Sequence, residues 1–108
     1  MSDALVELSV VTMTFDAADA GAAAALAAVL SHYVVVTRGE PGSRNVDLCA
    51  SITATGRFVI LEKWDSPTAQ RAHFDGPAMV TMASACSGLL ARAPDIELLE
   101  PISAHDLQ

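Results

Sequence analysis

The residues with the clearest chemical potential lie in one segment, between residues 60 and 77. Glu62 and Trp64 are two residues apart in an apolar run, so a β-strand would place both side chains on one face. His73 follows nine residues after Trp64. Histidine changes its protonation near neutral pH, so His73 could act as a general base toward an acidic hydroxyl group. Trp64 could hold a planar molecule by stacking, and Glu62 could accept a proton.

Each of these residues also has a structural interpretation, which stays open. His73 could bond to the backbone near a helix break, and Trp64 could close the core. Glu62 could instead form an ion pair with an arginine. The candidate arginines are Arg38, Arg57 and Arg71.

Four further side chains are candidates for binding a ligand. Phe74, Met79 and Met82 could form a soft, adaptable pocket wall, although methionines at helical spacing are also ordinary core residues. Asn45 could bond to a carbonyl group, or it could serve a turn.

No pattern predicts a metal or a cofactor. His32 and His105 have no carboxylate or cysteine at the spacing that metal ligands show. Glycine-rich phosphate loops, a nucleophile elbow and a dinucleotide fingerprint are missing. We expect Cys49 and Cys86 to be reduced, buried thiols, since two cysteines make no disulfide framework.

Composition narrows the classes of partner. The chain has 108 residues, 52% of them hydrophobic, which excludes general disorder. Its net charge of -7 and its 5% aromatic content disfavour nucleic acid and anionic lipid as partners. The apolar stretch 17–36 is rich in alanine and contains polar residues, so we do not expect it to span a membrane. Because the N-terminus lacks the basic start of a signal peptide, we expect a cytoplasmic protein.

The elements that must position these residues follow a β-α-β-β-α-β order. This order predicts an α+β, ferredoxin-like fold in a single domain, residues 1–108, with its core at about 4–102 and a frayed tail at 103–108. The predicted strands are 5–15, 45–53, 57–64 and 96–99. The predicted helices are 22–37 and a second one from Pro67, interrupted at Gly76-Pro77 and ended by Ala93-Pro94.

Two strands lack the alternation of a sheet with one wet face. Residues 58–61 are all apolar, and so are Val10 and Val11. The helices can cover only one face, so the sheet of a second copy is the simplest cover for the other. The pattern predicts a homodimer.

The segment from Ile60 to Pro77 resembles the antibiotic biosynthesis monooxygenase family of dimeric α+β barrels, and its quinol monooxygenase branch. The shared features are a strand ending Glu-x-Trp, a capped helix start, His73 and a proline-interrupted helix. The upstream stretch from Arg38 to Gly42 fits as well. The resemblance implies a pocket between helices and sheet in each subunit. It also implies that some relatives oxidise quinols or anthrones with O2 and no cofactor, while others degrade haem.

The sequence departs from the family at several positions. Ile60 stands where anthrone-oxidising members have Asn, and Met82 stands where haem-degrading members have a His ligand. Ala78 replaces a second His of many quinol-type members. Ser43 and Val46 replace a common Cys and Tyr.

Three functions remain. The first is a cofactor-independent monooxygenase that acts on a small quinol- or anthrone-like aromatic substrate, with His73 as base and Trp64 positioning the substrate. The second is a non-catalytic dimer that binds a small molecule, which Ile60, Ala78 and Val46 favour. The third is a haem-binding or haem-degrading relative.

Overall fold

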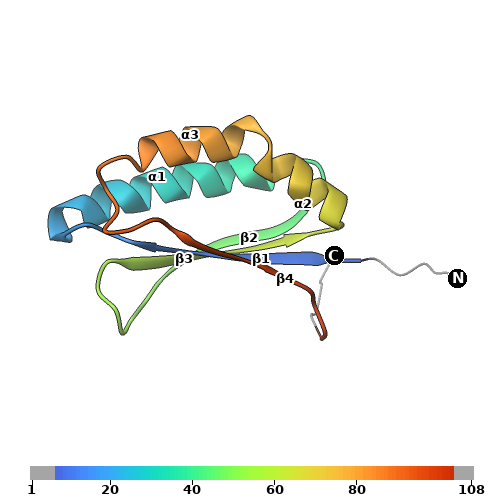
Figure 1. The fold of residues 1–108 in the computed structure, drawn as a ribbon, viewed down its shortest axis with the longest axis horizontal. Coiled ribbons are helices and arrows are strands. Elements are labelled where there is room, and N and C mark those ends of the chain that lie inside the picture. Colours follow the sequence, from blue (N-terminus) through green and yellow to red (C-terminus); the bar gives the residue numbers. More distant parts are fainter. Residues whose placement is uncertain (1–6, 104–108) are drawn as a thin grey trace, which may run out of the picture.

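In the computed structural model, which describes residues 7–103, four strands form one antiparallel sheet and helices lie on one of its faces (Figure 1). The strands are β1 (Ser9–Asp16), β2 (Ser43–Ala50), β3 (Arg57–Trp64) and β4 (Asp95–Leu99). The helices are α1 (Ala20–Arg38), α2 (Pro67–Phe74) and α3 (Pro77–Ala85). The strand order is β2-β3-β1-β4, which confirms the predicted ferredoxin-like α+β fold.

Strand limits follow local hydrogen bonds. β3 has the predicted limits, and β1 begins at Ser9. β2 ends at Ala50 and not at Thr53, because the Ser51 hydroxyl accepts the backbone N–H groups of Thr53 and Ala54 and turns the chain. The expected strand start at residues 5 and 6 and residues 104–108 of the expected tail lie outside the described residues.

Helix α1 matches its prediction closely. The Asp19 carboxylate accepts the Ala22 N–H at 2.8 Å and caps its start. By length and composition it is the one helix within residues 7–103 that could cross a membrane. It packs over the sheet instead (Figure 1), as a core helix does. Its buried residues are Leu26, Leu30, Tyr33, Val34 and Thr37.

The second helix is split as predicted. The Ser66 hydroxyl accepts the Ala69 N–H at 3.1 Å and caps α2, and Pro67 occupies the first turn. The chain breaks at Gly76, and Pro77 begins α3.

The predicted end of this second helix was wrong. We expected one helical stripe as far as Leu90, ended by Ala93-Pro94, but α3 ends at Ala85. Gly88 has a positive φ of 80° and turns the chain back, and Leu90 forms an isolated bridge with Ala17.

The apolar run of β3 divides between the two faces of the sheet. Ile60 is fully buried toward the helices. Val59 and Leu61 point to the face that the helices leave open, where Leu61 is 42% exposed. β1 alternates in the same way, with Val11 buried and Val10 on the open face. The helices therefore cover the apolar side chains on one face of the sheet and leave those on the other face uncovered.

One cysteine departs from expectation. Cys86 is free and buried, and burial raises the pKa of its thiol. Cys49 is also free, but it is exposed, because its register with Val59 places it on the open face.

A glycine turn at Gly42 connects α1 to β2 and packs against the start of α2. Gly42 has a φ of 84°, and its carbonyl accepts the Asp65 N–H at 2.9 Å. A Cβ there would lie 2.5 Å from Ala69 Cβ and 2.8 Å from Asp65 Oδ1. Only glycine fits this conformation and this close approach.

We predict that Gly42→Ala destabilises the fold by roughly 2–5 kcal/mol. This is the cost of a left-handed backbone at a residue with a Cβ plus the cost of the overpacked contact. Gly88→Ala is the matched control, because it has a φ of 80° and no atom within 4 Å of the added Cβ. It should cost only the backbone part, roughly 1–2 kcal/mol. Urea unfolding of both variants measures the difference, and equal losses would contradict the packing argument.

Candidate functional site

A buried polar cluster centres on the hydroxyl of Tyr33. This hydroxyl is hydrogen-bonded to Glu62 Oε2 and lies 2.7 Å from His73 Nε2. The Trp64 indole N–H donates to Glu62 Oε1 at 2.9 Å. On its other side, His73 Nδ1 lies 2.7 Å from Glu40 Oε1. Five side chains thus form one continuous hydrogen-bonded chain.

Four separate elements supply these side chains. Glu62 and Trp64 alternate on β3 and face the helices. Tyr33 comes from α1 and His73 from the last turn of α2. Glu40 lies in the turn after α1, which the glycine turn holds against α2. The Trp64 and His73 rings stack, with centroids 4.7 Å apart and planes 28° apart.

The cluster is closed to solvent except at one end. Glu62 is 1% exposed and the His73 side chain 0%, whereas the Glu40 side chain is 26% exposed. Burial, and then the charge of Glu62, raises the pKa of Tyr33 far above its usual range. Tyr33 therefore stays a neutral phenol that can both donate and accept.

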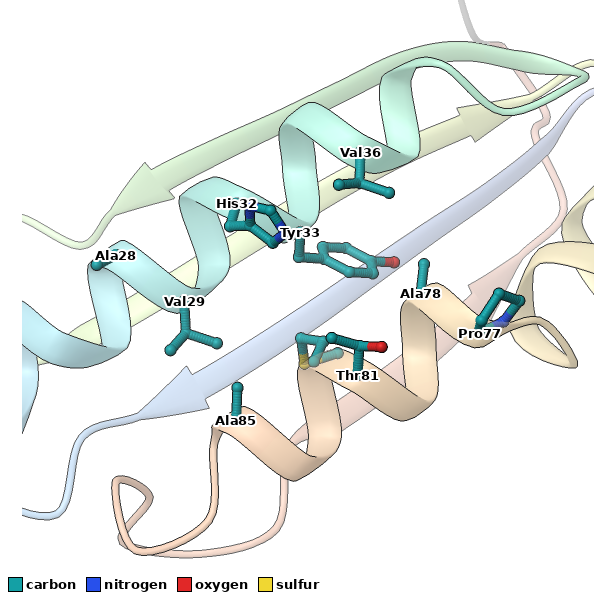
Figure 2. A pocket seen from close by; sticks show the side chains of 10 residues that line it. Ala28, Val29, His32, Tyr33, Val36, Pro77, Ala78, Thr81 and Ala85 are labelled. Carbon is teal, nitrogen blue, oxygen red and sulfur yellow. The ribbon is translucent and has the colours of Figure 1, made fainter.

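A pocket of about 460 Å³ lies between α1 and α3 (Figure 2). Its walls are apolar apart from His32, Tyr33 and Thr81. Figure 2 shows the Tyr33 ring between the two helices, with its oxygen directed toward Ala78. The other lining residues are Ala28, Val29, Val36, Pro77, Met82 and Ala85. Tyr33 is the one lining residue that also belongs to the buried cluster.

The sequence candidates lie at different distances from this pocket. Met82 lines it. Met79 contacts the cluster, since its sulfur lies 3.5 Å from the Tyr33 hydroxyl oxygen. Phe74 packs against the His73 ring, with centroids 5.9 Å apart. Asn45 is exposed on β2 and pairs with Lys63 on the open face of the sheet, so the structure does not bring it to the pocket.

His73 and Trp64 do not line the pocket. Both side chains are fully buried, and each covers a face of the other. Tyr33 is therefore the cluster residue that a pocket ligand can contact, and one face of Trp64 is occupied by His73.

Glu62 has partners other than the predicted arginines. Its two oxygens bond to Tyr33 and Trp64. Arg38 donates instead to the Val46 carbonyl at 3.0 Å, and Arg57 donates to Asp16 at 2.8 Å. The third candidate, Arg71, is exposed on α2.

Sequence reasoning missed three residues of the site. Tyr33, the single tyrosine of the chain, lies within the predicted helix 22–37, and the sequence pattern assigns it no chemical role. Glu40 was counted as part of a turn, and His32, which lines the pocket, was set aside for lack of metal spacing. Within residues 7–103, no group of three His, Cys, Asp or Glu side chains could hold a metal ion.

Solved structures of similar proteins cover nearly the whole chain. Rv0793 from Mycobacterium tuberculosis is 28% identical, with a TM-score of 0.82 over 90% of this chain and 97% of that one. A proposed antibiotic biosynthesis monooxygenase from Deinococcus radiodurans is 26% identical, with a TM-score of 0.82 over 93% and 98%. NE2512 from Nitrosomonas europaea, a protein of unknown function, shares the fold at 19% identity, with a TM-score of 0.83 over 95% and 97%.

The family comparison agrees with the structural one. No curated protein matches the chain. The family described as antibiotic biosynthesis monooxygenase matches residues 9–85, which include β1, the glycine turn and every residue of the polar cluster. The chain belongs to the antibiotic biosynthesis monooxygenase family.

Proposed function

We propose that this protein binds a small planar aromatic molecule between α1 and α3 and oxidises it with O2, without a cofactor. One observation carries the proposal: Tyr33, which lines the apolar pocket, is the central member of a buried hydrogen-bonded chain and lies between Glu62 and His73. Apolar walls suit an aromatic ring, and a few convergent polar groups fix its orientation. Family membership supports the reaction class.

The substrate class is a quinol- or anthrone-like compound. An anthrone-like CH2 group becomes a ketone when it loses two hydrogens and gains one oxygen atom. The second oxygen atom of O2 then leaves as water with those hydrogens. A quinol instead loses two protons and two electrons, and O2 becomes hydrogen peroxide. Both reactions are aided by removal of a proton from the substrate, because its anion reacts with O2 more readily.

Each site residue has a role in this proposal. Tyr33 meets the substrate, while His73 and Trp64 hold and polarise the chain behind it. Met82 supplies a soft wall, and Met79 packs on the Tyr33 hydroxyl.

A non-catalytic binding protein is the second candidate. It is favoured by Ala78, which contributes no polar group to the pocket wall, and by the apolar Ile60 and Val46 in the core. Haem binding is less well supported, because both ring nitrogens of His73 are already hydrogen-bonded.

Filling the pocket tests the binding site. Ala78→Leu should weaken binding of a menadiol- or anthrone-like compound by about 5- to 150-fold, since overpacking costs roughly 1–3 kcal/mol. Ala83→Leu on the exposed side of α3 is the matched control and should behave like the wild type. Ligand-induced changes in melting temperature and O2 uptake above the uncatalysed rate are the measurements.

The two candidates separate in the same experiment. O2 uptake that falls in Ala78→Leu but not in Ala83→Leu supports the enzyme. Ligand stabilisation without O2 uptake supports the binding protein. No stabilisation by any quinol or anthrone would exclude both.

We also propose a cytoplasmic homodimer joined through the open face of the sheet. Leu61 and Leu99 are 42% and 39% exposed on this face, where Val10 and Val59 adjoin them. Such a face is typically covered by another sheet.

Leu61→Lys should therefore shift the protein toward monomer, because it places a charge in the centre of the proposed contact. Val35→Lys is the control, since Val35 is 65% exposed on α1, away from the sheet face. Sedimentation at micromolar concentration measures both. A wild-type protein that stays a folded monomer would refute the dimer.

A further inference from the structure

The hydroxyl of Tyr33 cannot satisfy both of its neighbours by donating. A tyrosine hydroxyl carries one proton and accepts with its oxygen lone pairs. It contacts Glu62 Oε2, and its oxygen lies 2.7 Å from His73 Nε2. One proton serves only one of these acceptors, so either Glu62 or His73 must donate to the Tyr33 oxygen.

With Glu40 ionised, two arrangements satisfy the contacts of Tyr33 with Glu62 and His73, and of His73 with Glu40, with the same number of protons. In the first, Tyr33 donates to the Glu62 carboxylate, and a protonated His73 donates through Nε2. In the second, Glu62 is protonated and donates to Tyr33, which donates to a neutral His73. The arrangements differ by one short step of each of two protons, and Tyr33 is neutral in both. The hydroxyl can therefore pass a proton between Glu62 and His73.

Glu40 selects between these arrangements. Its carboxylate can only accept, so His73 Nδ1, at 2.7 Å, carries a hydrogen in both. The negative charge of Glu40 favours the first arrangement, in which His73 is positively charged. The Trp64 and Phe74 rings also contact the His73 ring and carry no charge. Glu40 is also the member of the chain with access to water.

We propose that Glu62 is the base of this site, that it takes a proton from a bound aromatic hydroxyl through Tyr33, and that Glu40 keeps His73 protonated. This inference rests on the proposed function for the class of ligand, but not for the arrangement of protons in the cluster. It assigns the proton acceptor to Glu62 and gives Glu40 a positioning role that the sequence did not suggest.

The proton transfer breaks and forms two O–H bonds. The ligand hydroxyl gives its proton to the Tyr33 oxygen, and the Tyr33 proton moves to Glu62 Oε2. Negative charge thus leaves Glu62 and appears on the ligand oxygen, while the protonated His73 stays next to the Tyr33 oxygen. The positive charge of His73 stabilises this anion in surroundings that contain little water. Reversal of these steps, or exchange through His73 and Glu40 with water, resets the cluster.

A coloured phenol tests the base directly. The probe is 4-nitrophenol, whose neutral and anionic forms absorb differently, at a pH where the free probe is mostly neutral. Binding to the wild type should convert it to the anion. Glu62→Gln and Tyr33→Phe should bind it in the neutral form. Asp75→Asn is the matched control, because it removes an exposed carboxylate two residues from His73 and outside the cluster.

Nitrogen NMR of the histidines tests the role of Glu40 without any ligand. In the wild type both ring nitrogens of His73 should be protonated at neutral pH. In Glu40→Gln, a variant at the exposed end of the cluster, Nε2 should lose its proton while Nδ1 keeps it. Asp75→Asn should leave the spectrum unchanged. Variants of His32 and His105 to Gln assign the resonances.

The outcomes separate this inference from the proposed function. Ionised nitrophenol without oxidation of any quinol or anthrone would refute the monooxygenase but support Glu62 as base. O2 uptake that survives Glu62→Gln, or nitrophenol bound in the neutral form by the wild type, would refute Glu62 as base. An unprotonated Nδ1 in the wild type, or a Glu40→Gln spectrum identical to it, would refute the role of Glu40.

Discussion

The buried carboxylate of Glu62 constrains the rest of the structure. A charge removed from water is tolerated only when hydrogen bonds replace the lost solvation. Trp64 on the same strand supplies one donor, and Tyr33 supplies the other from α1. Because the Tyr33 hydroxyl must reach β3, its bond sets where α1 lies along the sheet. The apolar residues around it, such as Ile60 and Leu30, add stability but specify position less sharply, since hydrophobic burial is not directional.

The same polar chain couples parts of the sequence that are far apart. Tyr33 and His73 are separated by 40 residues, and Glu40 and His73 by 33. The bond from Glu40 is available only because the glycine turn lets Gly42 pack against α2. The backbone conformation at Gly42 therefore affects the hydrogen bond between Glu40 and His73. A small displacement of α2 would lengthen both contacts of the imidazole at once.

Patterns of neighbouring residues were enough to predict most helices and strands. The composition of the site depends on contacts between residues far apart in the sequence. The Ser66 cap, the Gly76-Pro77 break and the Glu62–Trp64 alternation depend on neighbouring residues, and the structure has all three. The end of α3 was misplaced because Gly88 outweighed the apolar periodicity. Asn45 was predicted to contact a ligand, but it lies on the open face of the sheet. The strand register shifts between Ser43 and Asn45, so that Asn45 pairs with Lys63. Tyr33 and Glu40 carry no local signal, since their importance comes from partners on other elements.

The two faces of the sheet differ in what they contain. The face under the helices holds the polar chain and adjoins the pocket. The open face combines apolar residues with polar ones, since Leu61 pairs with Thr12 and Asp47 across the strands. Similarity to solved structures at 26–28% identity supports the same sheet and helices in this chain. It does not identify the reaction, because one fold can carry different chemistry. In the proposed reaction, the ligand atom that reaches the Tyr33 oxygen decides the outcome, and the small side chains of Ala78 and Ala85 leave room in the pocket wall for a ring. Under this proposal, substitutions in this wall change which ligand fits, while the buried chain and the proton transfer proposed for it stay intact.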